Sequence, residues 1–146
     1  MDTKTYLGQI SRLDRMIENK ISEITRLKVL FYGLSAVKLE ERVQTTPNHD
    51  KMGTAYAKIH DRQTALDRMI DEYVDKKAHI VEQIEKMSEE THYAILFSRY
   101  VARKGFSDIA NEIGYSERQV LRLHGEALVE FEAKYGSEYK DVTECH

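Results

Sequence analysis

Apolar residues recur at alternating steps of four and three residues along the first 34 positions of the chain. This heptad spacing is typical of a long helix that packs along a narrow seam and predicts one helix of roughly 35–40 residues. One seam position is charged, Lys20, which either sets the register of helix pairing or lays its methylene groups along the seam with its ammonium in water. We favour the second interpretation. The seam positions are Tyr6, Ile10, Leu13, Ile17, Lys20, Ile24, Leu27, Phe31 and Leu34.

A second stripe with the same spacing runs from Tyr56 to Met87, interrupted only by Gln63 and Lys77. Residues 45–54, which contain the only proline and a glycine, are predicted to form the loop before it. Neither helix can cover its stripe alone. We therefore expect residues 1–87 to form an antiparallel helical hairpin, either within one chain or in a bundle with a second copy.

The second apolar stripe ends at Met87, and a different pattern of apolar positions follows. Ser88 is predicted to cap a new helix with Glu89 and Glu90 in its first turn, ending at Lys104-Gly105. Its apolar face is expected to brace the two helices that follow. The residues of that face are Tyr93, Leu96, Phe97, Tyr100 and Val101.

Residues 106–125 have the features of a helix-turn-helix. Gly114 stands at the corner, where a residue without a Cβ most easily takes a positive φ. Ser107 and Ser116 stand where the two helices need N-caps. The residues expected to pack between the helices are Ile109, Ala110, Ile113, Val120 and Leu123. The sequence thus predicts an all-α fold: a hairpin at 1–87, a helix-turn-helix module at 88–135 and a flexible tail at 136–146.

The second helix of such a unit commonly lies in the major groove of DNA. Arginine can pair with guanine and glutamine with adenine, a serine at the helix start suits a phosphate, and a glutamate can accept a hydrogen bond from cytosine or hold a neighbouring arginine. The candidate DNA-contacting residues on this helix are Ser116, Glu117, Arg118, Gln119, Leu121 and Arg122. The candidates for contacting the DNA backbone from the preceding helix are Arg99, Arg103 and Lys104.

The distribution of charge along the chain predicts how strongly it would bind DNA without regard to sequence. The 146-residue chain has a net charge of −3, but residues 99–124 carry five basic and three acidic residues, with His124 beside them. A mildly basic surface on an acidic module predicts modest non-specific affinity with a shallow dependence on salt.

Little in the sequence indicates catalysis, a metal or a cofactor. Six scattered histidines include no four-ligand zinc spacing, and Cys145, the only cysteine, stands in the expected tail without a positioned base. We expect no enzyme activity, no cofactor and no metal site. The chain shows no signal-peptide pattern and no apolar run long enough to span a membrane, so we expect a cytoplasmic protein without a membrane partner.

From Ala94 to Phe131 the chain resembles region 4 of bacterial sigma factors. The matching pieces are Arg99-Tyr100, Ile109-Ala110, Gly114 and Glu126-Ala127-Leu128. With its long helical N-terminal half, the whole chain is similar to phage late-gene transcription regulators of the ArpU/RinA type. The resemblance implies sequence-specific binding of double-stranded DNA in a bacterial host cell, beside RNA polymerase.

The chain departs from primary sigma factors, which commonly have Arg-Glu in place of Glu117-Arg118 and Gln in place of Arg122. A standard promoter sequence is therefore not the expected target. Two other functions remain open: a small terminase-like protein that recognises DNA for packaging, and an adaptor that uses a sigma-like fold to bind protein. The operator, the sign of regulation and the copy number do not follow from the sequence.

The heptad seam also predicts self-association, with a dimer favoured, because a thin hairpin covers its apolar surface poorly. Such a dimer would place two reading helices on separated half-sites. The residues expected to carry this oligomerisation are Ile10, Leu13, Ile17, Ile24, Leu27 and Phe31.

Overall fold

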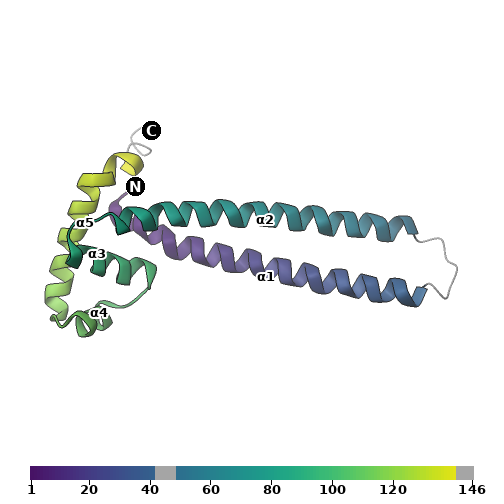
Figure 1. Cartoon of the computed structure of the whole chain (residues 1–146), viewed down its shortest axis with the longest axis horizontal. Coiled ribbons are helices and arrows are strands. Elements are labelled where there is room, and N and C mark those ends of the chain that lie inside the picture. Colours follow the sequence, from purple (N-terminus) through teal and green to yellow (C-terminus); the bar gives the residue numbers. More distant parts are fainter. Residues whose placement is uncertain (42–48, 141–146) are drawn as a thin grey trace. The chain divides into compact units, whose positions relative to one another are not determined.

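The computed structural model describes residues 1–41 and 49–140, with side chains described for 1–34 and 51–140. Within these ranges every regular element is a helix, so the predicted all-α class is confirmed (Figure 1). The elements in chain order are α1 (Thr3–Glu41), α2 (His49–Glu85), α3 (Glu90–Leu96), the π-helix η1 (Phe97–Val101), α4 (Phe106–Ile113) and α5 (Glu117–Lys140).

The two predicted stripes become the inner faces of α1 and α2. All positions of the second stripe are buried or half-buried, and so are those of the first except Phe31, which is 43% exposed. The predicted loop at 45–54 is wrong in its second part, because α2 already begins at His49. Glycine and polar residues do not stop a helix that is held by its apolar stripe. Residues 45–48 lie outside the described part of the chain.

The chain divides into two compact units, the first made of Met1–Asp14 and Asp75–His146, the second of Arg15–Val74. The helices α1 and α2 thus contribute to both units, whereas the predicted domain boundary falls after residue 87. The heptad spacing of α1 and of α2 runs across the boundary between the units in each helix, so it carries no signal for this division.

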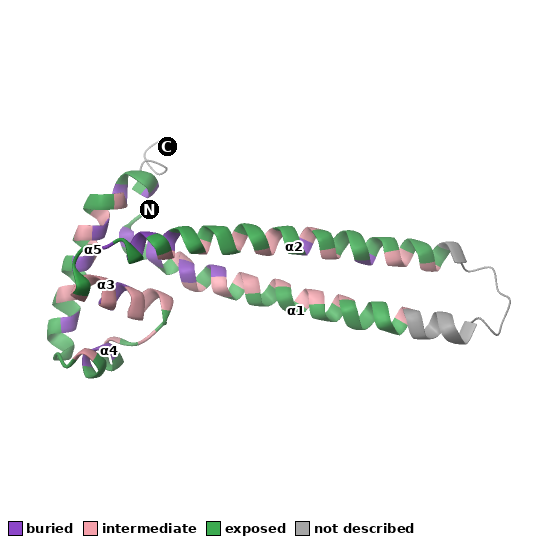
Figure 2. Cartoon of the chain, in the orientation of Figure 1, coloured by how far each residue is buried: buried purple, intermediate pink, exposed green. Residues whose placement is uncertain are grey.

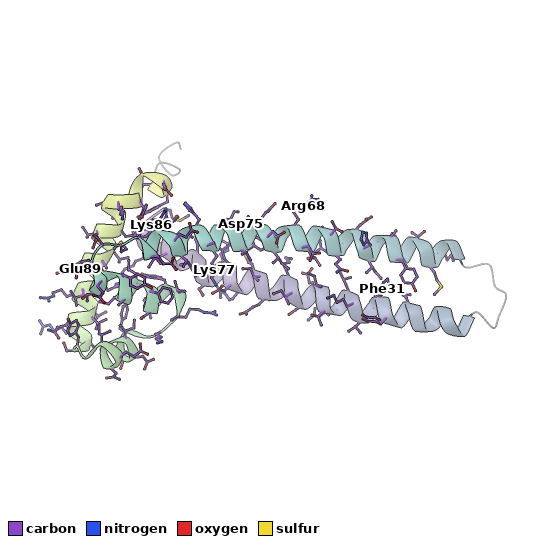
Figure 3. All side chains as sticks on the ribbon, viewed as in Figure 1. Phe31, Arg68, Asp75, Lys77, Lys86 and Glu89 are labelled. Atoms are coloured by element: carbon purple, nitrogen blue, oxygen red, sulfur yellow. The ribbon has the colours of Figure 1, made fainter. Side chains whose placement is uncertain are left out.

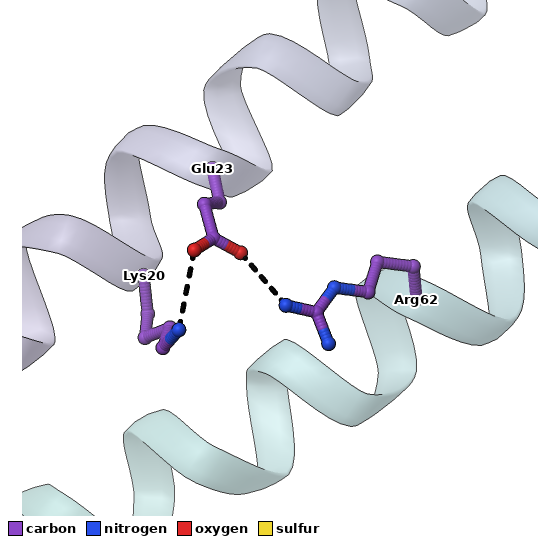
Figure 4. Close-up of polar contacts among 3 residues, drawn as sticks. All are labelled: Lys20, Glu23 and Arg62. Atoms are coloured by element: carbon purple, nitrogen blue, oxygen red, sulfur yellow. Dashed lines mark hydrogen bonds and ion pairs between the residues drawn. The ribbon is translucent and has the colours of Figure 1, made fainter.

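In the second unit, the segments of α1 and α2 run side by side (Figure 2). Ile59 and Leu66 of α2 are buried there. Lys20 contacts a charged partner rather than water alone: its Nζ lies 3.1 Å from Oε1 of Glu23, whose Oε2 lies 3.0 Å from Nη2 of Arg62 (Figure 4). The hydrogen bond from Lys20 lowers the pKa of Glu23. A lysine is therefore tolerated in the seam because its charge is paired at the edge.

In the first unit, the start of α1 packs on the end of α5. The rings of Tyr6 and Tyr139 stack with centroids 4.2 Å apart, and the Tyr139 hydroxyl lies 2.8 Å from Oγ1 of Thr3. Tyr6 donates a hydrogen bond to Oε1 of Gln83 at 2.6 Å, and burial raises the pKa of Tyr6 to about 12. These contacts make residues 136–140 helical, so the predicted flexible tail is wrong for this segment. Residues 141–146 lie outside the described part of the chain.

The second charged residue of the stripes, Lys77, is also paired. Its Nζ lies 2.6 Å from Oδ1 of Asp14, a carboxylate whose side chain is only 12% exposed. The other carboxylate oxygen lies 3.9 Å from Nη2 of Arg103. Asp14 therefore joins α1, α2 and the segment after η1 inside the first unit.

The bracing helix differs from its prediction at both ends. Glu89 rather than Ser88 takes the N-cap position, and the Ser88 hydroxyl donates to Oε1 of Glu130 at 3.2 Å instead. The helix then widens into η1 and ends at Val101, not at Lys104-Gly105. Arg103 has a φ of 57°, a left-handed conformation in which a right-handed helix cannot continue to Lys104-Gly105.

Candidate nucleic-acid interface

The turn between α4 and α5 has the geometry that its glycine predicts. Gly114 has a φ of 75° and donates its N–H to the carbonyl of Ala110 at 3.0 Å, which ends α4. The next N–H, of Tyr115, bonds to the same carbonyl at 3.1 Å. The predicted positions then meet in one cluster, packed on α3. Its buried members are Ile95, Ile109, Ala110 and Val120, with Phe106, Ile113 and Leu123 packed against them.

A reciprocal capping box begins α5. The Oγ of Ser116 accepts the N–H of Gln119 at 3.2 Å, and Oε1 of Gln119 accepts the N–H of Ser116 at 3.1 Å. The prediction that Ser116 is an N-cap is confirmed. The same prediction for Ser107 is wrong: Gly105 takes the cap position and Phe106 opens α4, because its ring packs inside the module.

The start of α5 presents an exposed face, which we call the α5 outer face. Its side chains are exposed while Val120 on the opposite side is fully buried, as the helical period predicts (Figure 2). Arg122 is 69% exposed, with Nε 4.0 Å from Oε1 of Glu126, and Arg118 takes part in no ion pair among the described side chains. The members of this face are Ser116, Glu117, Arg118, Gln119, Leu121, Arg122 and Gly125.

The three cations predicted to contact the DNA backbone all have internal partners. The Arg99 guanidinium lies 4.2 Å from the centre of the Phe106 ring and donates to the carbonyl of Lys104 at 3.2 Å. The Lys104 ammonium lies 2.6 Å from Oε1 of Glu112, and Arg103 contacts Asp14. The spacing of the sequence gave no sign that Asp14 of α1 and Glu112 of α4 would pair with Arg103 and Lys104.

His124, which the charge count treats as a neighbour of the basic residues, is a neutral core residue. It is 5% exposed, and its Nε2 lies 2.9 Å from the Tyr100 hydroxyl. The Phe106 ring packs edge-on at 5.0 Å. Burial, with smaller contributions from the charges of Lys4 and Arg99, lowers the pKa of His124 to about 4. His124 therefore adds no positive charge to the module at neutral pH.

The residues predicted to carry oligomerisation occupy three environments. Ile10 and Leu13 are buried within the first unit of a single chain, so neither is available to a partner in this conformation. Ile17, Ile24 and Leu27 are half-buried in the second unit, and Phe31 is exposed. The large apolar residues of α1 that are exposed and lie outside the seam are Ile21, Val29, Leu30 and Tyr32.

Among residues 1–41 and 49–140, no group of three or more histidine, cysteine or acidic side chains is arranged to hold a metal ion. Cys145 and His146 lie outside that part of the chain. None of the described helices combines the length and the apolar character needed to cross a membrane. No family model matches the sequence, and no curated protein or solved structure matches it significantly.

Proposed function

We propose that this protein binds double-stranded DNA in a sequence-specific manner through the α5 outer face and regulates transcription of a phage or mobile element. The observation that carries the proposal is the pair of exposed guanidinium groups, Arg118 and Arg122, within the first two turns of a capped helix. Two arginines at this place suit guanine edges in a major groove.

The rigid position of α5 favours sequence-specific recognition over non-specific electrostatic binding. The start of α5 is fixed by the turn at Gly114, by the capping box and by the buried cluster that contains Val120. A reading helix needs such support because base contacts depend on its position to within a fraction of an ångström. The internal pairing of Arg99, Arg103 and Lys104 reduces what they add to backbone affinity, so specificity rests mainly on α5.

Self-association is the second part of the proposal. Two copies would place two recognition helices on one duplex, and once the first is bound the second binds at a high effective concentration. The surface we assign to this role is the exposed apolar segment of α1 in the second unit, formed by Val29, Leu30, Phe31 and Tyr32. Such a regulator acts in the bacterial host cell, where contact with RNA polymerase would follow DNA binding.

The proposal is tested by selecting duplexes from a random pool with the full chain and measuring affinity for the selected duplex and a scrambled one. We expect Arg118→Ala or Arg122→Ala to weaken binding to the selected duplex by about 1–3 kcal/mol and to change the scrambled duplex much less. Arg68→Ala is the matched control, because Arg68 is an exposed arginine on α2 (Figure 3).

Two results would count against DNA reading. If the wild-type chain enriches no sequence, DNA recognition by α5 is rejected. If the chain binds RNA polymerase without binding any duplex, the adaptor function replaces it. Assembly into rings with affinity for a packaging site would favour the terminase-like function instead.

A further inference from the structure

The capping box removes Gln119 from the set of base-reading residues. Its Oε1 accepts the Ser116 N–H at 3.1 Å and lies 3.3 Å from the Ser116 hydroxyl. Adenine is read by glutamine through a bidentate contact that needs both the amide oxygen and the amide nitrogen. With its oxygen engaged, Gln119 is a positioning residue that fixes the start of α5. Any contact to an A·T pair is then left to the other side chains of the α5 outer face.

Leu121 is the apolar side chain on this face, with 49% of its surface exposed. It stands one turn after Arg118 and beside Arg122, so all three point toward the same partner. The residue one turn further along is Gly125, and a Cβ there would meet nothing within 4 Å. No side chain at that position therefore covers Leu121 from the C-terminal side.

We propose that Leu121 contacts the 5-methyl group of a thymine next to the guanine that Arg118 reads. This inference rests on the proposed DNA binding and adds the chemistry of the second base. The thymine methyl is the apolar group that the major groove offers, and apolar side-chain groups recognise it by contact. An exposed leucine between two arginines matches that pattern of one apolar group among acceptors.

The test replaces each thymine of the selected duplex with deoxyuridine, one at a time, which removes only the methyl group. For the wild-type full chain we expect an affinity loss of about fourfold at one position, the equivalent of one buried methyl group. Leu121→Ala should show a similar loss on the thymine duplex and no further loss with deoxyuridine. Leu121→Met, which stays apolar, should keep the dependence on thymine.

Val129→Ala is the matched control, because Val129 is 68% exposed on the same helix but lies beyond the α5 outer face. It should keep the full thymine dependence. If every deoxyuridine is tolerated, or if Leu121→Ala remains sensitive to the methyl group, the role of Leu121 is overturned while DNA binding stands. If the wild-type chain selects no sequence, the proposed function itself fails and this inference fails with it.

Discussion

At the scale of single residues, His124 makes the stability of the first unit depend on pH. Its pKa is about 4 in the folded chain against 6.5 for an ordinary histidine, so the unfolded chain binds the proton more tightly. The stabilisation is fully present above pH 6.5 and is lost as pH falls from 6.5 to 4. The difference of pKa values corresponds to about 3 kcal/mol of unfolding free energy.

We predict that, between pH 6.5 and 4, the unfolding free energy measured with urea falls more steeply for the wild-type chain than for His124→Gln. The glutamine amide stays neutral and can still meet the Tyr100 hydroxyl. The variant will be less stable at pH 7, so the comparison uses the slope of stability against pH. Parallel curves for the two proteins would show that folding does not lower the pKa of His124.

Residues whose role is local were predictable from the sequence, and residues whose role depends on a distant partner were not. Gly114 and Ser116 act on backbone groups within four positions, so their types and spacing sufficed. Asp14 and His124 are defined by Lys77 and Tyr100, which lie 63 and 24 positions away. No spacing rule links such pairs before the helices have packed.

At the scale of elements, α5 contains two glycines with different surroundings. Gly125 is exposed and a Cβ there would meet nothing within 4 Å, whereas at Gly136 it would lie 3.1 Å from Cγ of Glu132. Glycine in a helix interior costs about 0.5–1 kcal/mol relative to alanine. We predict that Gly125→Ala raises the unfolding free energy by about that amount, measured by urea denaturation.

Gly136→Ala is the matched control and should gain less, because Glu132 must move by a few tenths of an ångström to admit the methyl group. Equal gains would show that packing at Gly136 is looser than the structure indicates. A loss of stability with Gly125→Ala would contradict the open surroundings of its Cβ.

The cores of the elements were easier to predict than their ends. Long apolar stripes fix α1 and α2 because each repeats the same signal over many turns. The position of a helix end depends on only one or two residues, and neighbouring residues can take the same role. The N-cap of α3 is Glu89 rather than Ser88, and α4 begins at Phe106 rather than after Ser107. The end of α5 was missed because the burial of Tyr139 against Tyr6 outweighs the glycine and polar residues around it.

At the scale of the whole molecule, the all-α class followed from periodicity, and the division into units did not. Heptad spacing specifies that a helix packs against a partner, but it does not say which partner or where one packing environment gives way to the next. In α1, the early seam residues Tyr6, Ile10 and Leu13 pack in the first unit, and later ones such as Ile24 pack in the second. Burial therefore decreases along α1 although the heptad spacing stays the same.

Because burial decreases along α1, its later part exposes apolar side chains that a second copy of the chain could cover. Val29, Leu30, Phe31 and Tyr32 are consecutive, so they point around the whole circumference of α1, and they are 67%, 56%, 43% and 70% exposed. A helix that is apolar on every side is stable in water only when other surfaces cover it, and α2 covers one side.

We predict that the wild-type chain sediments as a dimer or larger assembly and that the double variant Val29→Glu, Tyr32→Glu sediments as a monomer. The charge control is Val129→Glu on α5, which should leave the assembly unchanged. A wild-type chain that remains monomeric at high concentration would show that this segment has no partner copy, and a single reading helix would then have to supply all the DNA affinity.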